Sequence, residues 1–126
     1  MAKLDGKKIL IAEDDSLLAQ MLAKKLGEEN GTVEHAADGE AAMGMLKANK
    51  YDVLLLDLML PKVDGFGVLT ALPTIDMSKG TPVIVLSNLG QKADVEKGMA
   101  LGAKKFLIKA ILSLDDIADS ILEVLK

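Results

Sequence analysis

The chain alternates short apolar runs with amphipathic segments five times along its 126 residues. The apolar runs have the length of strands and are hydrophobic on successive residues, which is typical of strands covered on both faces of a parallel sheet. The intervening segments carry apolar residues at three- and four-residue spacing, as helices packed on a sheet do. Because parallel strands need a crossover between them, the pattern predicts βα units in one α/β domain.

The periodicity gives approximate bounds for five strands and five helices. The predicted strands cover residues 8–12, 32–37, 53–56, 82–86 and 104–108. The predicted helices cover residues 16 to about 29, 40–48, 66–72, 93–101 and a last segment that begins after residue 113. We expect Asp15 to cap the first helix, Pro73 to stop the third, and Ser113 with Asp116 to form a capping box at the start of the fifth.

Composition excludes several classes of function. The chain has no cysteine, so disulfides, thiolate metal sites and cysteine nucleophiles are excluded. A net charge of −4 and only three aromatic residues disfavour direct binding of nucleic acid, which needs a basic surface and rings that stack on bases. The sequence has neither a signal peptide nor an apolar run long enough to span a membrane. We therefore expect a cytoplasmic protein without membrane insertion, with one domain over residues 1–126 and no appended output domain.

Polar side chains follow four of the predicted strands at the points where these strands end. Glu13 and Asp14 follow the first strand, Asp57 the third, Ser87 the fourth and Lys109 the fifth. Because the carboxyl ends of parallel strands meet at one edge of the sheet, we expect these side chains to converge. Clustered carboxylates repel one another unless a cation lies among them. Oxygen ligands without histidine or cysteine suit Mg²⁺, which binds through carboxylates and phosphate oxygens.

The same residues could also handle a phosphoryl group. The Lys109 ammonium and the Ser87 hydroxyl could hold phosphoryl oxygens, which leaves Asp57 as a nucleophile that forms an acyl phosphate. The metal ion and Lys109 would spread the charge of a loose transition state. Taken singly, Glu13, Asp14 or Asp57 could simply cap the next helix. Helix capping does not account for all five residues at one edge.

These motifs resemble those of the receiver domains of bacterial response regulators. The resemblance rests on residues 9–15, on residues 57–61 with 64–65, on Ser87 after an apolar strand, and on residues 102–103 followed by 106–109. It runs from residue 8 to the last helix. It implies a flavodoxin-like, doubly wound (βα)5 fold with a five-stranded parallel sheet in the order 2-1-3-4-5.

The resemblance also implies a phosphoacceptor of a two-component phosphorelay rather than a turnover enzyme. Asp57 would take a phosphoryl group from a histidine kinase or a phosphotransfer protein in a Mg²⁺-dependent reaction, and the domain would later hydrolyse it. The Mg²⁺ ligands would be the Asp14 and Asp57 side chains and the Met59 carbonyl. Glu13 would act on the metal ion through water.

A conformational switch is a further implication of the resemblance. Ser87 and Lys109 would contact the phosphoryl group, and Phe106 would be the switch aromatic, which turns inward as the Ser87 hydroxyl moves toward the phosphate. The change would reach the face built from the fourth helix, the fifth strand and the fifth helix, where a downstream protein target would bind. The domain would act as a monomer or as a phosphorylation-dependent dimer.

Two positions depart from the family's usual pattern. Ala110 stands where the family usually has a proline after the strand-five lysine, and Asn88 stands where a small residue commonly follows the strand-four hydroxyl. They keep an alternative open, namely a receiver-like interaction module or a stabilised scaffold that does not switch by phosphorylation. Other classes fail on particular residues. A haloacid dehalogenase-type phosphatase needs a second aspartate where Met59 stands, and a flavodoxin needs a hydroxyl- and glycine-rich loop where residues 13–15 are acidic.

Two further expectations concern single residues. His35 is the only histidine, lies in the second predicted strand without nearby ligands, and is expected to be a solvated surface side chain. Met21 lies at core spacing in the first predicted helix and is expected to pack inward.

Overall fold

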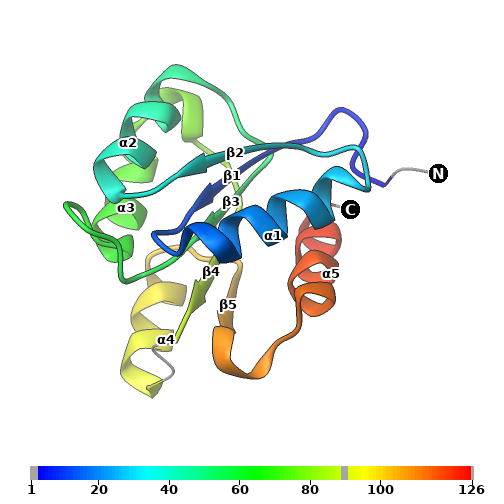
Figure 1. Ribbon diagram of the computed structural model, residues 1–126. Helices are drawn as coiled ribbons and strands as arrows, with labels where there is room; N and C mark the ends of the chain where they lie inside the picture. Colours follow the sequence, from blue (N-terminus) through cyan, green and yellow to red (C-terminus); the bar gives the residue numbers. More distant parts are fainter. Residues whose placement is uncertain (1–2, 89–90, 126) are drawn as a thin grey trace.

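The computed structural model describes residues 3–88 and 91–125. Within these residues, parallel strands form one sheet in the order β2-β1-β3-β4-β5, with helices on both faces (Figure 1). The strands are β1 (Lys8–Ala12), β2 (Thr32–Ala36), β3 (Val53–Leu56), β4 (Val83–Ser87) and β5 (Lys105–Ile108). The helices are α1 (Ser16–Gly27), α2 (Gly39–Ala48), α3 (Gly65–Ala71), α4 (Lys92–Ala100) and α5 (Leu114–Val124). The predicted flavodoxin-like α/β fold and its strand order are confirmed.

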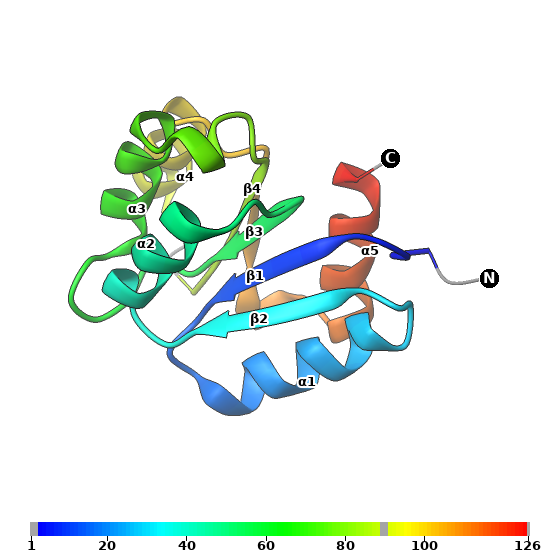
Figure 2. The same ribbon diagram turned by 90° about the horizontal axis from the view of Figure 1, so that it is seen from above.

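The sheet separates two hydrophobic layers. Helices α1 and α5 cover one face, and α2, α3 and α4 lie on the other (Figure 2). Because successive side chains of a strand point to opposite faces, β3 serves both layers: Val53 and Leu55 pack on the side of α1 and α5, and Leu54 and Leu56 on the side of α2 and α3. All four residues of β3 are buried, as the central position of this strand requires.

The helices that follow β1, β2 and β3 have side-chain N-caps. The Asp15 carboxylate accepts a hydrogen bond from the Leu18 N–H, and Asp38 and Asp64 cap α2 and α3 in the same way. The predicted capping box of Ser113 and Asp116 is present at the start of α5. The aspartate caps fix where the loops after β1, β2 and β3 turn into helices, which limits the freedom of the residues at the strand ends.

Some details differ from the predictions. Helix α1 ends at Gly27, earlier than expected, and the chain turns toward β2 through Asn30, whose φ is 63°. The prediction that Met21 packs inward is wrong, because this side chain is 41% exposed. The buried face of α1 is formed by Ala19, Leu22 and Leu26. Met21 directly precedes Leu22 and therefore lies about 100° away around the helix from it.

Three short 3-10 turns complete the described structure, at Leu72–Thr74, Asp76–Ser78 and Lys109–Ile111. Helix α3 ends at Ala71, and Pro73 lies in the first of these turns, where it needs no hydrogen-bond donor. No helix of the described chain is long and apolar enough to cross a membrane.

Candidate functional site

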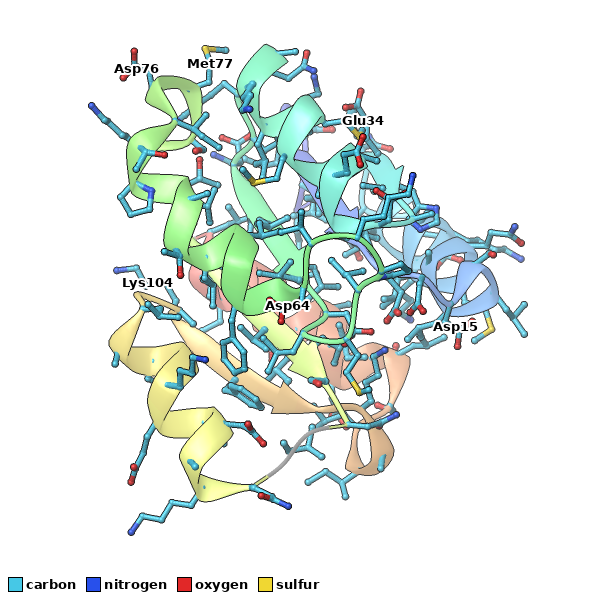
Figure 3. The ribbon with its side chains drawn as sticks, turned by 90° about the vertical axis from the view of Figure 1, so that its left-hand side faces the viewer. Asp15, Glu34, Asp64, Asp76, Met77 and Lys104 are labelled. Atoms are coloured by element: carbon cyan, nitrogen blue, oxygen red, sulfur yellow. The ribbon has the colours of Figure 1, made fainter. Side chains whose placement is uncertain are left out.

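Three carboxylates meet at the carboxyl edge of the sheet. Glu13, Asp14 and Asp57 each offer one oxygen, and these oxygens all lie within 4.8 Å of one another. Glu13 is 2% exposed and Asp57 is 5% exposed, whereas Asp14 faces solvent. Figure 3 views this edge, with the capping residues Asp15 and Asp64 marking the loops after β1 and β3. The predicted convergence of the acidic residues is therefore found in the structure.

Lys109 joins the two buried carboxylates. Its Nζ lies 2.9 Å from Asp57 Oδ2 and 2.5 Å from Glu13 Oε1. Lys109 directly follows β5 and opens the 3-10 turn Lys109–Ile111, and its ammonium reaches residues that follow β1 and β3, on the far side of β4 in the sheet order. Among the described residues no peptide bond is cis, so the bond between Lys109 and Ala110 is trans. The Lys109 ammonium reaches both carboxylates with the backbone in this conformation. A proline at position 110 is thus not needed to bring the lysine to Asp57.

Backbone groups orient the remaining carboxylate oxygens. The Met59 N–H donates to Asp57 Oδ1 at 3.1 Å, and the Asp15 N–H donates to Glu13 Oε2 at 3.1 Å. Each buried carboxylate therefore has one oxygen on the backbone and the other beside Lys109. Because both ends of each carboxylate are engaged, the two groups are held in fixed directions before any ligand binds.

The loop after β3 is held tightly against α2. The Gly39 N–H donates to the Pro61 carbonyl at 3.1 Å, and the Gly65 N–H donates to the Leu58 carbonyl at 2.9 Å. A Cβ atom at Gly39 would lie only 1.7 Å from the Val63 carbonyl oxygen, so the two segments approach backbone to backbone. This packing fixes the segment that carries Asp57 and Met59.

Burial dominates the electrostatics of Glu13. Burial raises the pKa of Glu13 to about 7, the nearby Lys109 ammonium lowers it in part, and the Asp57 carboxylate raises it further. Burial alone would lower the pKa of Lys109, but the bonds to Glu13 and Asp57 raise it above its usual value. The lysine thus stays charged, and it only partly compensates the two acids.

The donor set fits a hard divalent cation. Among the described residues, Glu13 Oε1 is buried without a hydrogen-bond partner of suitable geometry, although the Lys109 ammonium lies 2.5 Å away. Three carboxylates and one ammonium leave excess negative charge, and all of the available donors are oxygens. Mg²⁺ prefers such ligands, so Glu13, Asp14 and Asp57 could hold it. The Met59 carbonyl, the other predicted ligand, belongs to the same loop.

Ser87 and Phe106 lie on the neighbouring strands. Ser87 is completely buried at the end of β4, where it pairs with Ile108 of β5, the residue before Lys109. Phe106 of β5 is half-buried, and its ring lies against α4 at Gly98, where a Cβ atom would be 3.1 Å from the ring. Asn88, which follows Ser87, is exposed. Ser87 thus lies at the functional edge, and Phe106 lies between the sheet and α4.

His35 is a partner of the site that the sequence pattern does not reveal. It is exposed, as expected, but its Nε2 lies 2.6 Å from the Glu13 carbonyl oxygen. The expected surface position is therefore confirmed, and the bond to Glu13 is a contact that the sequence does not predict. Its place follows from the register of β1 and β2, in which His35 pairs with Ile11, two residues before Glu13. The register is the signal that would reveal this contact, and it is not visible in the sequence alone.

The raised pKa of Glu13 predicts how stability depends on pH in the metal-free protein. The native state keeps the Glu13 proton up to a pH of about 7, whereas the unfolded chain loses it near 4.5. The native state therefore binds more protons between these values, and the contribution of Glu13 to the free energy of unfolding falls as the pH rises through this window.

Urea unfolding at a series of pH values measures this effect. We expect the contribution of Glu13 to make the free energy of unfolding of wild type fall between pH 4.5 and 7, and we expect Glu13→Gln to lack this contribution. Equal slopes in wild type and Glu13→Gln would contradict the raised pKa.

Comparisons with known proteins agree with this geometry. The family model of the response regulator receiver domain matches residues 9–122. The probable transcriptional regulatory protein SilR of Salmonella typhimurium is 38% identical over 102 residues, which cover 81% of this chain and 44% of SilR. The transcriptional regulatory protein TcrA of Mycobacterium tuberculosis is 36% identical over 115 residues, which cover 91% of this chain and 44% of TcrA. The chain thus spans less than half the length of these relatives.

Solved structures agree in fold and size. The receiver domain of the Francisella response regulator 1452 superimposes with a TM-score of 0.87 at 31% identity, covering 95% of this chain and 97% of that one. The chemotaxis protein CheY4 of Vibrio cholerae gives a TM-score of 0.86 at 26% identity, covering 94% and 98%. With the sheet order, the acidic edge and the match over residues 9–122 in agreement, the chain belongs to the family of response regulator receiver domains, which are signalling modules rather than turnover enzymes.

Proposed function

We propose that the chain is the phosphoacceptor of a two-component phosphorelay and that Asp57 receives the phosphoryl group. The donor would be a histidine kinase or a phosphotransfer protein, and the reaction would require Mg²⁺. One observation carries the proposal: the buried Asp57 carboxylate is held between the Met59 N–H and the Lys109 ammonium, beside two further acids at the sheet edge. A structural aspartate has no need of two acidic neighbours, since they only raise the free energy of its charged form.

The transfer step needs few protein groups. One carboxylate oxygen of Asp57 attacks phosphorus, and the P–N bond to the donor histidine breaks as the new P–O bond forms. The bonding pair returns to the imidazole nitrogen, and the product is an acyl phosphate on Asp57. Mg²⁺ bound by Glu13, Asp14 and Asp57 would supply positive charge against the carboxylates and the phosphoryl oxygens.

Lys109 and Ser87 would hold the transferred group. In the unphosphorylated state the Lys109 ammonium forms ion pairs with the Glu13 and Asp57 carboxylates. After transfer, it would turn to a phosphoryl oxygen, while the Ser87 hydroxyl would donate to another. Hydrolysis by water at phosphorus would later return Asp57 to the free carboxylate, so that the domain would limit the lifetime of its own signal.

The output would leave through α4, β5 and α5. Helix α4 has few attachments in the described structure: Gly98 is its one buried residue, and the Gln91 side chain at its N-terminus makes no capping hydrogen bond. Phe106 lies three residues before Lys109 in the sequence, and its ring packs against Gly98 of α4. A movement of Lys109 and Ser87 toward the phosphate would therefore reach α4 through Phe106. We propose that a downstream target binds this face, with the domain as a monomer or a phosphorylation-dependent dimer.

Exposed apolar side chains near the site would receive the phosphodonor protein. Leu17 in the first turn of α1 is 66% exposed, and Ile111 in the turn that follows β5 is 76% exposed. Leu17 lies on the segment that follows β1, and Ile111 lies on the segment that follows β5. Both strands end at the edge of the sheet where the acidic residues lie. We propose that Leu17 and Ile111 contribute to the surface that contacts the phosphodonor, because each lies on a segment that follows a strand ending beside the acidic residues.

Acetyl phosphate, a small phosphodonor, tests the proposal without a cognate kinase. We expect intact-mass spectrometry to detect one added phosphoryl group on wild type in the presence of Mg²⁺, and none after chelation. Asp57→Ala should abolish the addition, because its side chain cannot form an acyl phosphate. Asp119→Ala, at an exposed position on α5, is the matched control and should be modified like wild type.

The same assay separates the proposal from its alternative. An interaction module or scaffold that does not use phosphorylation would bind its partners without gaining a phosphoryl group, so its mass would not change in this assay. Folded wild type that gains no phosphoryl group at saturating Mg²⁺, from acetyl phosphate and from a histidine kinase, would overturn the proposed function.

A further inference from the structure

His35 bonds to the backbone of the acidic site from the neighbouring strand. Its Nε2 lies 2.6 Å from the carbonyl oxygen of Glu13. Since a carbonyl oxygen can only accept, Nε2 is the donor in this bond. His35 belongs to the edge strand β2 and is itself exposed, so no packing requirement explains why the ring takes this position.

The bond completes the attachment of Glu13 to β2. The Glu13 N–H donates to the Ala36 carbonyl at 3.0 Å, and the Glu13 carbonyl accepts from His35. The paired register ends at Ala12 and Ala36, where β2 turns away toward α2. In a continued parallel ladder, a backbone N–H of β2 would serve the Glu13 carbonyl. Here the imidazole supplies that donor, one residue beyond the end of the ladder.

This backbone position matters because Glu13 and Asp14, two acids of the cluster, are adjacent in the sequence. The carbonyl that His35 binds belongs to the peptide between Glu13 and Asp14, so the bond restrains rotation of that peptide. The residues on either side of this peptide are the exposed Asp14, whose carboxylate belongs to the cluster with Asp57, and Glu13, whose Oε2 accepts from the Asp15 N–H at 3.1 Å. A change in the two backbone dihedrals that flank the peptide would alter the direction of one side chain relative to the other. A restraint on this one peptide therefore helps to hold two of the three carboxylates in their relative directions.

We propose that His35 is a positioning residue for the metal site, which holds the Glu13–Asp14 peptide so that both carboxylates face the cation. The metal's role rests on the proposed function, but the positioning acts on this chain's own residues. Groups that orient metal ligands without touching the metal commonly change metal affinity by about 10- to 100-fold when they are removed.

Three substitutions at one position separate positioning from other effects. The Nε2 of a glutamine side chain lies the same number of bonds from Cα as the Nε2 of histidine, so His35→Gln keeps a donor at the right reach. The asparagine amide is one bond shorter and cannot replace it, and alanine has no donor. A Mg²⁺ titration followed by the amide NMR resonances of Asp57 and Met59 measures affinity directly, with no need for phosphorylation.

We expect His35→Ala and His35→Asn to weaken Mg²⁺ binding about tenfold and His35→Gln to stay within about twofold of wild type. Urea unfolding provides the control for stability. Equal Mg²⁺ affinity in wild type and His35→Ala would overturn the inference and leave the proposed function standing, and so would a loss in His35→Gln as large as that in His35→Ala. A wild type that binds no Mg²⁺ would overturn both.

Discussion

Lys109→Met is expected to destabilise the metal-free protein by about 3 kcal/mol near neutral pH. Lys109 is the cation that lies 2.5 Å from Glu13 and 2.9 Å from Asp57, and both of these carboxylates are buried. Removing one partner of a buried ion pair leaves a charge that is neither solvated nor paired. We place the loss at the lower end of the usual range because Glu13, whose pKa is already raised to about 7, takes up a proton instead of staying charged.

Lys105→Met is the matched control for this substitution. Lys105 lies four residues earlier, and its Nζ is 2.9 Å from Glu123 Oε2, in an ion pair whose carboxylate is mostly exposed. Ion pairs of this kind contribute about 0–1 kcal/mol, so the control should lose far less stability than Lys109→Met. Urea unfolding measures both variants. Similar losses in the two variants would contradict the view that Lys109 holds two buried charges together.

Magnesium should reduce the difference between Lys109→Met and wild type. If Glu13, Asp14 and Asp57 bind the cation, its positive charge offsets the negative charge of Glu13 and Asp57, which have lost their ion pairs with Lys109. The midpoint of urea unfolding of Lys109→Met should therefore rise more with Mg²⁺ than that of wild type, by linkage between binding and folding. An equal rise in both proteins would indicate that the cation and the lysine do not share these carboxylates.

Gly39→Ala and Gly44→Ala should change stability in opposite directions, although both lie in α2. A Cβ atom at Gly39 would lie 1.7 Å from the Val63 carbonyl oxygen and 2.7 Å from the Val63 Cβ, and the opposing atoms are mainly backbone. The loop after β3 would have to move, at a cost of about 3 kcal/mol. A Cβ at Gly44 would meet nothing within 4 Å, so alanine there should stabilise the helix by about 0.5–1 kcal/mol.

The Gly39 substitution also links packing to the site. The loop that it displaces carries Met59, whose N–H orients the Asp57 carboxylate at 3.1 Å. Gly39→Ala should therefore slow phosphorylation by acetyl phosphate, whereas Gly44→Ala should leave the rate unchanged. Thermal or urea unfolding together with the mass assay reads both effects. A stable Gly39→Ala variant with a normal rate would show that the loop tolerates displacement and does not position Asp57.

Local sequence patterns predict the elements of this fold better than their contacts. Buried strands and capped helices depend on such patterns, and Asp15, Ser113 and Asp116 act as the patterns predict. The prediction for Met21 is wrong because apolar spacing in α1 fits more than one face of the helix, and only packing on the sheet decides between them. The strand order follows from the resemblance to receiver domains, since periodicity says nothing about which strands are neighbours.

The members of the site are predictable from the sequence, and their connections are not. Parallel strands bring their carboxyl ends to one edge, so the positions of Glu13, Asp57 and Lys109 directly after three strands predict that these side chains converge. The direction of Lys109 depends on the turn after β5, and the contact of His35 with Glu13 depends on the register of β1 and β2. Neither contact has a local pattern, because each depends on how distant segments pack together.

The attachment point of the phosphoryl group is the most direct test of the central claim. Borohydride reduces an acyl phosphate of aspartate to homoserine and leaves phosphoserine and free carboxylates unchanged. After treatment with acetyl phosphate and Mg²⁺, followed by borohydride and peptide mapping, homoserine is expected at position 57 in wild type and nowhere in Asp57→Ala. Homoserine at another aspartate, or a stable phosphate on Ser87 with an unchanged Asp57, would contradict the account.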